Sequence, residues 1–374
     1  MSTSGHEANF SNRSTDFRCG IPPSLPSTVP RAVDYVYAAV VLAIIILSLS
    51  LNGFVVFLVA THKSLREKTL FLSLQINVSH LVFTLSVLVF VVASAVADKW
   101  LLGDIMCQIM GLIQHSAISL RFFLMLVLAL DRVFTVFMPF HYDLRYGTRV
   151  AIGMSAAAWV ISIFRVVLPV EGILNCYTYV PAFSFCSVAP SCSRRCAIFA
   201  YTVFSTAVLL GGIIPFVLYV VLFCKARRLQ RRMRRQSVCS YNINSSNKTE
   251  FSSKQEHEWR ALITFFILFV SLLGCSLPSF VLFVLTFALQ QSPHPAVIIL
   301  QKLVGRTLMF TLTVIDPVAI MRNQDIRLAV RTTKLYSCLF RQCRTKEWSI
   351  NATSTTIDLQ GVRLPSATHA NGSV

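Results

Sequence analysis

Residues 107–139 read CQIMGLIQHSAISLRFFLMLVLALDRVFTVFMP, an apolar run with three unusual polar features. It begins with Cys107, carries Arg121 alone near its middle, and ends close to the acid–base doublet Asp131-Arg132. At about 1.5 Å of rise per residue, a helix of this length crosses a bilayer. A transmembrane helix inside a bundle explains all three features, because the bundle shelters the lone cation while both ends reach water.

The composition of the whole chain favours a membrane protein with several spans. Of its 374 residues, 55% are hydrophobic and only 13% are charged, which is too apolar for a soluble domain. The net charge of +18 comes from short basic clusters between apolar runs. We interpret these clusters as cytoplasmic loops and not as a nucleic-acid surface.

Seven apolar runs are long enough to cross the membrane, and they predict an all-α bundle of seven transmembrane helices. Helices are required because the backbone must satisfy its own hydrogen bonds in hydrocarbon, and no run has the alternation of a barrel strand. We place the spans at about 35–61, 70–97, 104–138, 150–170, 197–224, 260–289 and 297–321. Residues 322–374 are expected to form a short amphipathic eighth helix and a disordered tail.

The charges predict the orientation of the bundle. Basic residues concentrate in 62–68, in 225–235 and after 321, so these segments are expected in the cytoplasm and residues 1–34 outside the cell. That N-terminal segment contains glycan acceptor sequons at Asn9 and Asn12. It lacks a charged-then-apolar leader, so we expect the first span to act as the membrane signal.

The positions of the cysteines agree with this orientation. Six of them fall on the expected outer side, where disulfides form: Cys19, Cys107, Cys176, Cys186, Cys192 and Cys196. Cys338 and Cys343 follow the last span and are candidates for palmitoylation, with unmodified thiols as the alternative.

Several motifs in their order and spacing resemble those of rhodopsin-like (class A) G-protein-coupled receptors, and the resemblance covers all seven spans. Cys107 lies 25 residues before Arg132, as the family's disulfide cysteine lies before its Asp-Arg doublet. Asn52 resembles the asparagine of the family's first helix, and we expect it to belong to one polar network in the middle of the membrane with His80, Arg121 and Asp316. The fourth-helix tryptophan and the helix-kinking prolines are similar to Trp159, Pro215, Pro278 and Pro317.

Some stretches resemble the olfactory receptors within that family. Pro139-Phe140-His141-Tyr142 is similar to their second cytoplasmic loop, and Met321-Arg322-Asn323 to the start of their eighth helix. The loop at 225–259 is longer than is usual for olfactory receptors, so the subfamily stays open.

The resemblance implies a lock at each end of the third span. Cys107 is expected to bond one of four cysteines in the loop 171–196, and we choose Cys186. At the cytoplasmic end, Asp131 and Arg132 resemble the family's switch, with Glu258 as the acid on the sixth span that would pair with Arg132. The alternative is two solvated charges whose pairing is worth about 0–1 kcal/mol.

The middle of the membrane departs from the family. Where members usually keep polar residues that hold a sodium ion, this chain has His80, Arg121 and Asp316. A lone arginine there costs about 2.5–3.5 kcal/mol on insertion scales, so it should face a partner. We expect the guanidinium to replace the sodium ion beside Asp316; the alternative is that Arg121 contacts only backbone carbonyls and water.

Three side chains that the family uses for activation are absent. The sixth-helix tryptophan is replaced by Ser276, the seventh-helix tyrosine by Ile320 and the fifth-helix tyrosine by Phe223. The sequence therefore predicts either weak coupling or a rewired switch.

The candidate ligand site lies in the outer half of the bundle. We assign it Gln114, His115 and Ile118 on the third span and Lys302 and Arg306 on the seventh. The two cations, four residues apart on one helical face, suggest an acidic ligand. In the alternative, Lys302 is solvated and Arg306 pairs with Glu171.

The resemblance implies a receptor in the plasma membrane that passes the signal of an extracellular ligand, which we expect to be an odorant or an acidic small molecule, to a heterotrimeric G protein. No nucleophile–base pair, metal-ligand cluster or phosphate loop indicates an enzyme, a cofactor or a metal, and membrane lipid is the other expected partner. A peptide receptor with atypical coupling, a non-signalling receptor, and a transporter that uses Arg121 and Asp316 remain alternatives.

Overall fold

The computed structural model describes residues 30–62, 65, 68–137, 148–167, 176–180, 184–188, 194–239, 245–288 and 295–332. By its internal contacts the chain divides into Met1–Arg327 and Leu328–Val374, and only the first unit concerns the bundle. The domain boundaries at 34 and 321 stay predictions.

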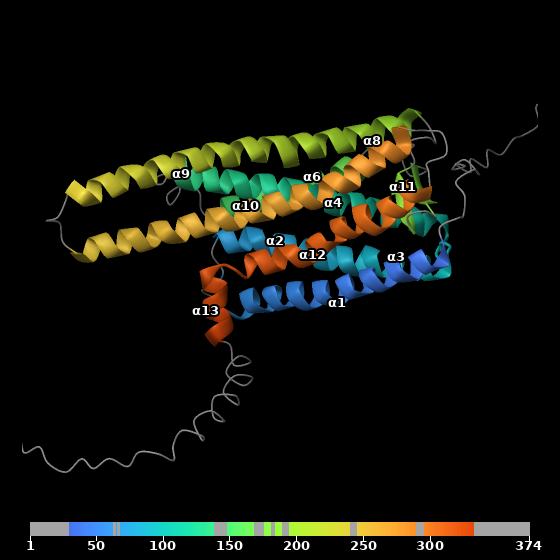
Figure 1. Cartoon of the computed structure of the whole chain (residues 1–374), viewed down its shortest axis with the longest axis horizontal. Helices are drawn as coiled ribbons and strands as arrows, with labels where there is room; N and C mark the ends of the chain where they lie inside the picture. Colours follow the sequence, from blue (N-terminus) through green and yellow to red (C-terminus); the bar gives the residue numbers. More distant parts are fainter. Residues whose placement is uncertain are drawn as a thin grey trace, which may run out of the picture. The chain divides into compact units, whose positions relative to one another are not determined.

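Long helices that run alongside one another make up the first unit (Figure 1). They correspond to the seven predicted runs, so the prediction of a seven-helix bundle is confirmed. In chain order they are α1 (Arg31–Thr61), α2 (Lys68–Phe83) with η2 (Thr84–Leu88) and α3 (Val89–Ala97), α4 (Gly103–Phe137), α6 (Thr148–Val167), α8 (Arg194–Ala207) with η5 (Val208–Ile213) and α9 (Ile214–Cys239), α10 (Ser245–Ala288), and α11 (Pro295–Leu300) with η6 (Gln301–Arg306) and α12 (Thr307–Ile320). A short helix, α13 (Gln324–Thr332), follows.

Six of these helices are long and apolar enough to cross a membrane by length and composition. The seventh, α4, has 35 residues and so spans about 50 Å, but it carries buried charges at Arg121, Asp131 and Arg132. Large apolar side chains such as Ile46 and Phe164 are exposed on the outside of the bundle. That surface is the one a bilayer would cover.

Three of the spans contain a π-helical stretch, at η2, η5 and η6. Such stretches widen one turn and often occur at functional positions. In η5, Gly211 leaves the space in which the Phe122 ring of α4 lies, because a Cβ there would overlap the ring.

A β-hairpin covers one end of the helices, which we call the hairpin end. Its strands β1 (Tyr177–Val180) and β2 (Phe185–Val188) pair antiparallel, with Tyr177 opposite Val188. All four residues of β2 are buried, and Phe185 belongs to the same apolar cluster as residues of α1, α3 and α12. The hairpin is therefore part of the core and not a surface loop.

The hairpin is fastened to α4 by specific contacts. The Gln108 amide donates to the Tyr177 carbonyl and accepts from the Tyr177 backbone N–H at 3.3 Å, as a neighbouring strand would. Gly111 leaves the space in which the Tyr177 ring lies, because a Cβ there would overlap the ring. On another helix, Ser94 donates a hydrogen bond to the Ser184 carbonyl at 2.5 Å.

Candidate functional site: a buried polar network

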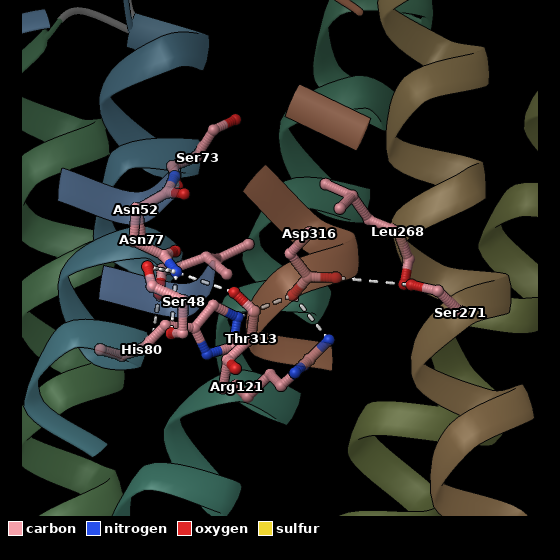
Figure 2. A network of polar contacts seen from close by, with 12 residues as sticks. Ser48, Asn52, Ser73, Asn77, His80, Arg121, Leu268, Ser271, Thr313 and Asp316 are labelled. Carbon is pink, nitrogen blue, oxygen red and sulfur yellow. Dashed lines mark hydrogen bonds and ion pairs between the residues drawn. The ribbon is translucent and has the colours of Figure 1, made fainter. Parts of the chain in front are cut away.

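Asp316, fully buried on α12, is the acceptor at the centre of a polar network inside the bundle. The Arg121 guanidinium on α4 lies 2.6 Å from its Oδ2, and Nε2 of His80 on α2 lies 2.9 Å from the same oxygen. Ser271 on α10 donates to Oδ1 at 3.4 Å. One carboxylate therefore contacts side chains from three other helices, as Figure 2 shows.

A second group of hydrogen bonds connects α1 to this region. The Asn52 amide donates to the carbonyls of Ser48 (2.8 Å) and Thr313 (2.7 Å), and the Ser48 hydroxyl lies 2.8 Å from that of Thr84. All four side chains are buried. Figure 2 shows Thr313 on the same helix as Asp316, one turn away, so α1 and the carboxylate meet on α12.

The geometry agrees with what membrane energetics predict for these charges. A lone ion in hydrocarbon is costly, whereas Arg121 and Asp316 in contact bring no net charge into the bundle. The sequence predicted Asn52, His80, Arg121 and Asp316 as one network, and the structure brings the last three into direct contact. The sequence analysis missed Ser271, whose only signal is its position one turn before Cys275-Ser276 on the same span.

A cavity of about 50 Å³ lies against this network. His80 and Arg121 line it together with Ile118, Phe122 and Ser276. Ser276 stands where the resemblance places a tryptophan, and its small side chain leaves the space open. Of the predicted ligand residues, Ile118 is the one that borders this cavity.

The other two predicted ligand residues of α4 face the hairpin. Gln114 is buried and lines a second, smaller cavity of about 10 Å³ beside Phe185. His115 Nδ1 lies 3.1 Å from the Gly111 carbonyl, and its ring meets the Tyr177 ring edge-on at 5.3 Å. The hairpin thus fills the space next to both residues.

The prediction of a two-cation ligand site is wrong at Lys302. Its ammonium group is buried and bonded to Asp34 on α1, and it lies 5.3 Å from the Tyr37 ring centre. Lys302 is therefore neither solvated nor a charge available to an acidic ligand. Arg306 is also buried, with its guanidinium 4.3 Å from the centre of the Phe185 ring.

The predicted switch doublet lies buried at the end of α4 that is remote from the hairpin. Arg132 donates from Nε (3.0 Å) and Nη2 to Oδ2 of Asp131, and its guanidinium lies 5.3 Å from the Phe265 ring on α10. The Glu258 side chain lies outside the described residues, so its bridge to Arg132 stays a prediction.

One residue near the doublet was missed by the sequence analysis. Tyr219 on α9, one turn before Phe223, is fully buried, packs on the Phe269 ring at 5.4 Å, and interacts electrostatically with Arg132. Its hydroxyl has no hydrogen-bond partner among the residues that the structure describes. A tyrosine hydroxyl is therefore present near the switch, although at a different position from that expected.

Two disulfides between described residues hold the hairpin end. Cys107 is bonded to Cys186, the partner that we chose, and Cys176 is bonded to Cys196. The first joins α4 to β2, and the second joins the residue before β1 to the first turn of α8. The glycosylation candidates Asn9 and Asn12, the palmitoylation candidates Cys338 and Cys343, and Cys19, Cys192 and Glu171 lie outside the described residues.

No group of three or more histidine, cysteine or acidic side chains that could hold a metal ion occurs in the described part of the chain.

Comparisons with known proteins agree on one family. Residues 51–319 match the family model described as "7 transmembrane receptor (rhodopsin family)". The chain is 27% identical to the human KiSS-1 receptor over 165 residues, which cover 43% of this chain and 42% of that receptor. It is 29% identical to a probable G-protein coupled receptor, No18, of Amphibalanus amphitrite over 198 residues, covering 53% of this chain and 51% of that protein.

Two further similarities extend the comparison. The Neuropeptide Y receptor type 1 of Xenopus laevis is 27% identical over 111 residues, or 30% of each chain. The matched regions thus span about half of these curated relatives or less. The crystal structure of squid rhodopsin has the same fold, with a TM-score of 0.70 at 18% identity, covering 90% of this chain and 96% of that one.

Proposed function

The chain belongs to the rhodopsin family of seven-transmembrane receptors, and from this premise we propose that it transmits the binding of an extracellular ligand to a heterotrimeric G protein. The observation that carries the proposal is the layout of α4. A disulfide holds this helix to the hairpin at Cys107, Asp316 contacts it at Arg121, and the buried Asp131-Arg132 doublet lies at its other end. One helix therefore connects a ligand-side anchor to a G-protein-side switch.

In the proposed orientation, the hairpin end faces the outside of the cell and the doublet faces the cytoplasm. The basic residues of α9, including Arg227 and Arg228, support this arrangement, because cytoplasmic segments are enriched in lysine and arginine. The plasma membrane is the proposed location. The same basic face would meet anionic lipid or an acidic surface of the G protein.

The proposed mechanism is a population shift between two arrangements of the bundle. In the described arrangement the carboxylate of Asp131 holds Arg132, and Asp316 holds α2, α4 and α10 together. A ligand that favours a different spacing of these helices weakens those contacts and frees the doublet end for the G protein. Tyr219 is buried near Arg132, and its hydroxyl has no hydrogen-bond partner among the described residues. This hydroxyl would accept or donate a hydrogen bond in the second arrangement.

For the ligand, we propose a small molecule that binds inside the bundle, with an odorant as one case. The cavity beside Arg121 supports this proposal, since apolar side chains such as Phe83 and Met309 line it together with the polar groups of His80 and Arg121. An acidic ligand is disfavoured because Lys302 is already bonded to Asp34. A peptide at the hairpin end is the second candidate, and the similarity to receptors named for KiSS-1 and neuropeptide Y favours it.

Second-messenger output of the surface-expressed receptor tests the signalling proposal. We expect Arg132→Ala to lower basal and ligand-driven output, and Glu258→Ala to raise basal output. Arg149→Ala is the matched control, because Arg149 is an exposed arginine at the first turn of α6. Output that does not change in Arg132→Ala would argue for a non-signalling receptor, and unchanged basal output in Glu258→Ala would exclude the predicted bridge.

The role of Arg121 is a further part of the proposal. The resemblance places Arg121 where family members hold a sodium ion, and its contact with Asp316 supports the idea of a built-in cation. His80 is a neighbour on the same oxygen. The receptor should then be indifferent to sodium.

A further inference from the structure

The cavity beside Arg121 has the features of a binding site for a small neutral molecule. Its volume of about 50 Å³ is several times the roughly 10–15 Å³ that holds one water. Apolar side chains such as Phe83, Phe122 and Met309 line it together with polar side chains that include Arg121. A molecule with a short apolar body and one polar head fits such a space.

The Nε–H group of Arg121 is a hydrogen-bond donor without an acceptor among the described residues. The Arg121 side chain is buried, and its Nη2 lies against Asp316. A buried donor without an acceptor is costly, by about 1–3 kcal/mol. An acceptor atom brought into the cavity would remove that cost.

The charges decide which kind of acceptor the cavity takes. The guanidinium is already balanced by Asp316 at 2.6 Å, so a carboxylate ligand would place a second anion close to Asp316 in a low-dielectric interior. A carbonyl, ether or hydroxyl oxygen accepts the same hydrogen bond without adding charge. We infer that the cavity lined by Arg121, Ile118 and Ser276 binds a small neutral molecule with one hydrogen-bond acceptor, such as a short-chain ketone, aldehyde or ester.

Binding at this site does not depend on the proposed signalling, whereas any effect of the ligand on output rests on it. A molecule of about five non-hydrogen atoms can bind no more tightly than the low-micromolar range. A ligand of this size would therefore act at high local concentration.

The test measures binding of three probes of equal size to the purified full-length receptor in lipid nanodiscs, by ligand-observed NMR. Butanone carries a neutral acceptor, 2-methyl-1-butene has none, and propionate is anionic. Ser276→Leu fills the cavity, and Ser50→Leu adds the same side chain on the lipid-facing side of α1, where Ser50 is exposed. The difference between these two variants removes the contribution of probe dissolved in the lipid.

We expect butanone to bind wild type and Ser50→Leu equally, and at least tenfold more weakly to Ser276→Leu. The hydrocarbon and propionate should bind wild type at least fivefold more weakly than butanone. Arg121→Lys keeps the charge but replaces the guanidinium and its Nε donor by a shorter ammonium group, so it should reduce the preference for butanone over the hydrocarbon.

Equal binding of butanone to Ser276→Leu and Ser50→Leu at similar melting temperatures would overturn the inference, as would tighter binding of propionate. The two proposals fail separately. If butanone binding depends on the cavity but the receptor gives no second-messenger output, the proposed site stands and the proposed signalling is refuted. If the receptor signals but no binding depends on the cavity, the proposed site is refuted.

Discussion

Replacing Arg121 by methionine removes the cation of the buried pair and keeps a side chain of similar length. Asp316, which is fully buried, is then left with His80 and Ser271 as its described contacts. Neither is a permanent cation. The free carboxylate should behave as an uncompensated charge, and a sodium ion should become able to bind it.

The structure sets the size of the effect. Removing one partner of a buried ion pair costs about 3–5 kcal/mol, and the remaining hydrogen bonds place Arg121→Met near the lower value. At about 2 °C per kcal/mol for a chain of this length, the melting temperature should fall by about 6 °C in sodium-free buffer. If the variant binds sodium with a Kd of about 15 mM, about 150 mM sodium returns about 1.4 kcal/mol, or about 3 °C.

The assay is thermal unfolding of purified receptor in sodium chloride and in choline chloride of equal ionic strength. Wild type should melt at the same temperature in both, whereas Arg121→Met should melt higher in sodium. The double variant Arg121→Met/Asp316→Asn should lose the sodium response and recover most of the stability, because both charges are gone.

A clear rise of the wild-type melting temperature in sodium, abolished by Asp316→Ala, would refute the built-in cation. So would an Arg121→Met variant as stable as wild type in choline chloride, since the pair would then contribute nothing to the fold.

Three further outcomes follow from single contacts. Gly111→Ala should lower the free energy of unfolding by about 1–3 kcal/mol, because the added Cβ overlaps the Tyr177 ring. Adding Tyr177→Leu should restore part of that loss, as read from melting temperature and surface expression. If Gly111→Ala is as stable as wild type, the ring can move aside. Asp34→Asn should cost about 3 kcal/mol by leaving Lys302 buried without its carboxylate, while the double variant with Lys302→Met should be close to wild type in melting temperature; an additive double variant contradicts this. Asp131→Asn should raise basal second-messenger output at equal surface expression, because the neighbouring arginine loses its buried carboxylate, and an unchanged output would separate this contact from the switch.

The sequence alone was sufficient where physics allowed few solutions. Seven apolar runs had to be helices, and most of their bounds agree with the structure to within a few residues. The exceptions are the end of the fifth span and the start of the sixth, where α9 continues to Cys239 and α10 already begins at Ser245. Arg121 and Asp316 could be paired because few partners exist for a charge in the middle of a membrane.

The sequence was insufficient where contacts depend on how helices turn toward one another. Lys302 and Arg306 share a face of their own helix, but that spacing does not show that Asp34 on α1 lies within reach of Lys302. Likewise, nothing in residues 176–188 indicates that Tyr177 and Phe185 become core residues, because that burial depends on the space left at Gly111 and on two disulfides. Tyr219 was missed for the same reason, because its position near Arg132 depends on how α9 turns toward α4.

The contact between Arg121 and Asp316 also has a consequence for biosynthesis. The two residues are separated by about 195 positions in the sequence, and synthesis at about 5–20 residues per second places Asp316 in the membrane on the order of 10–40 s after Arg121. During that interval α4 resides in the bilayer with a cation that lacks its carboxylate, the arrangement that quality control would recognise as unfinished. A truncation before Asp316 should therefore be retained and degraded, even though six of the seven helices are complete.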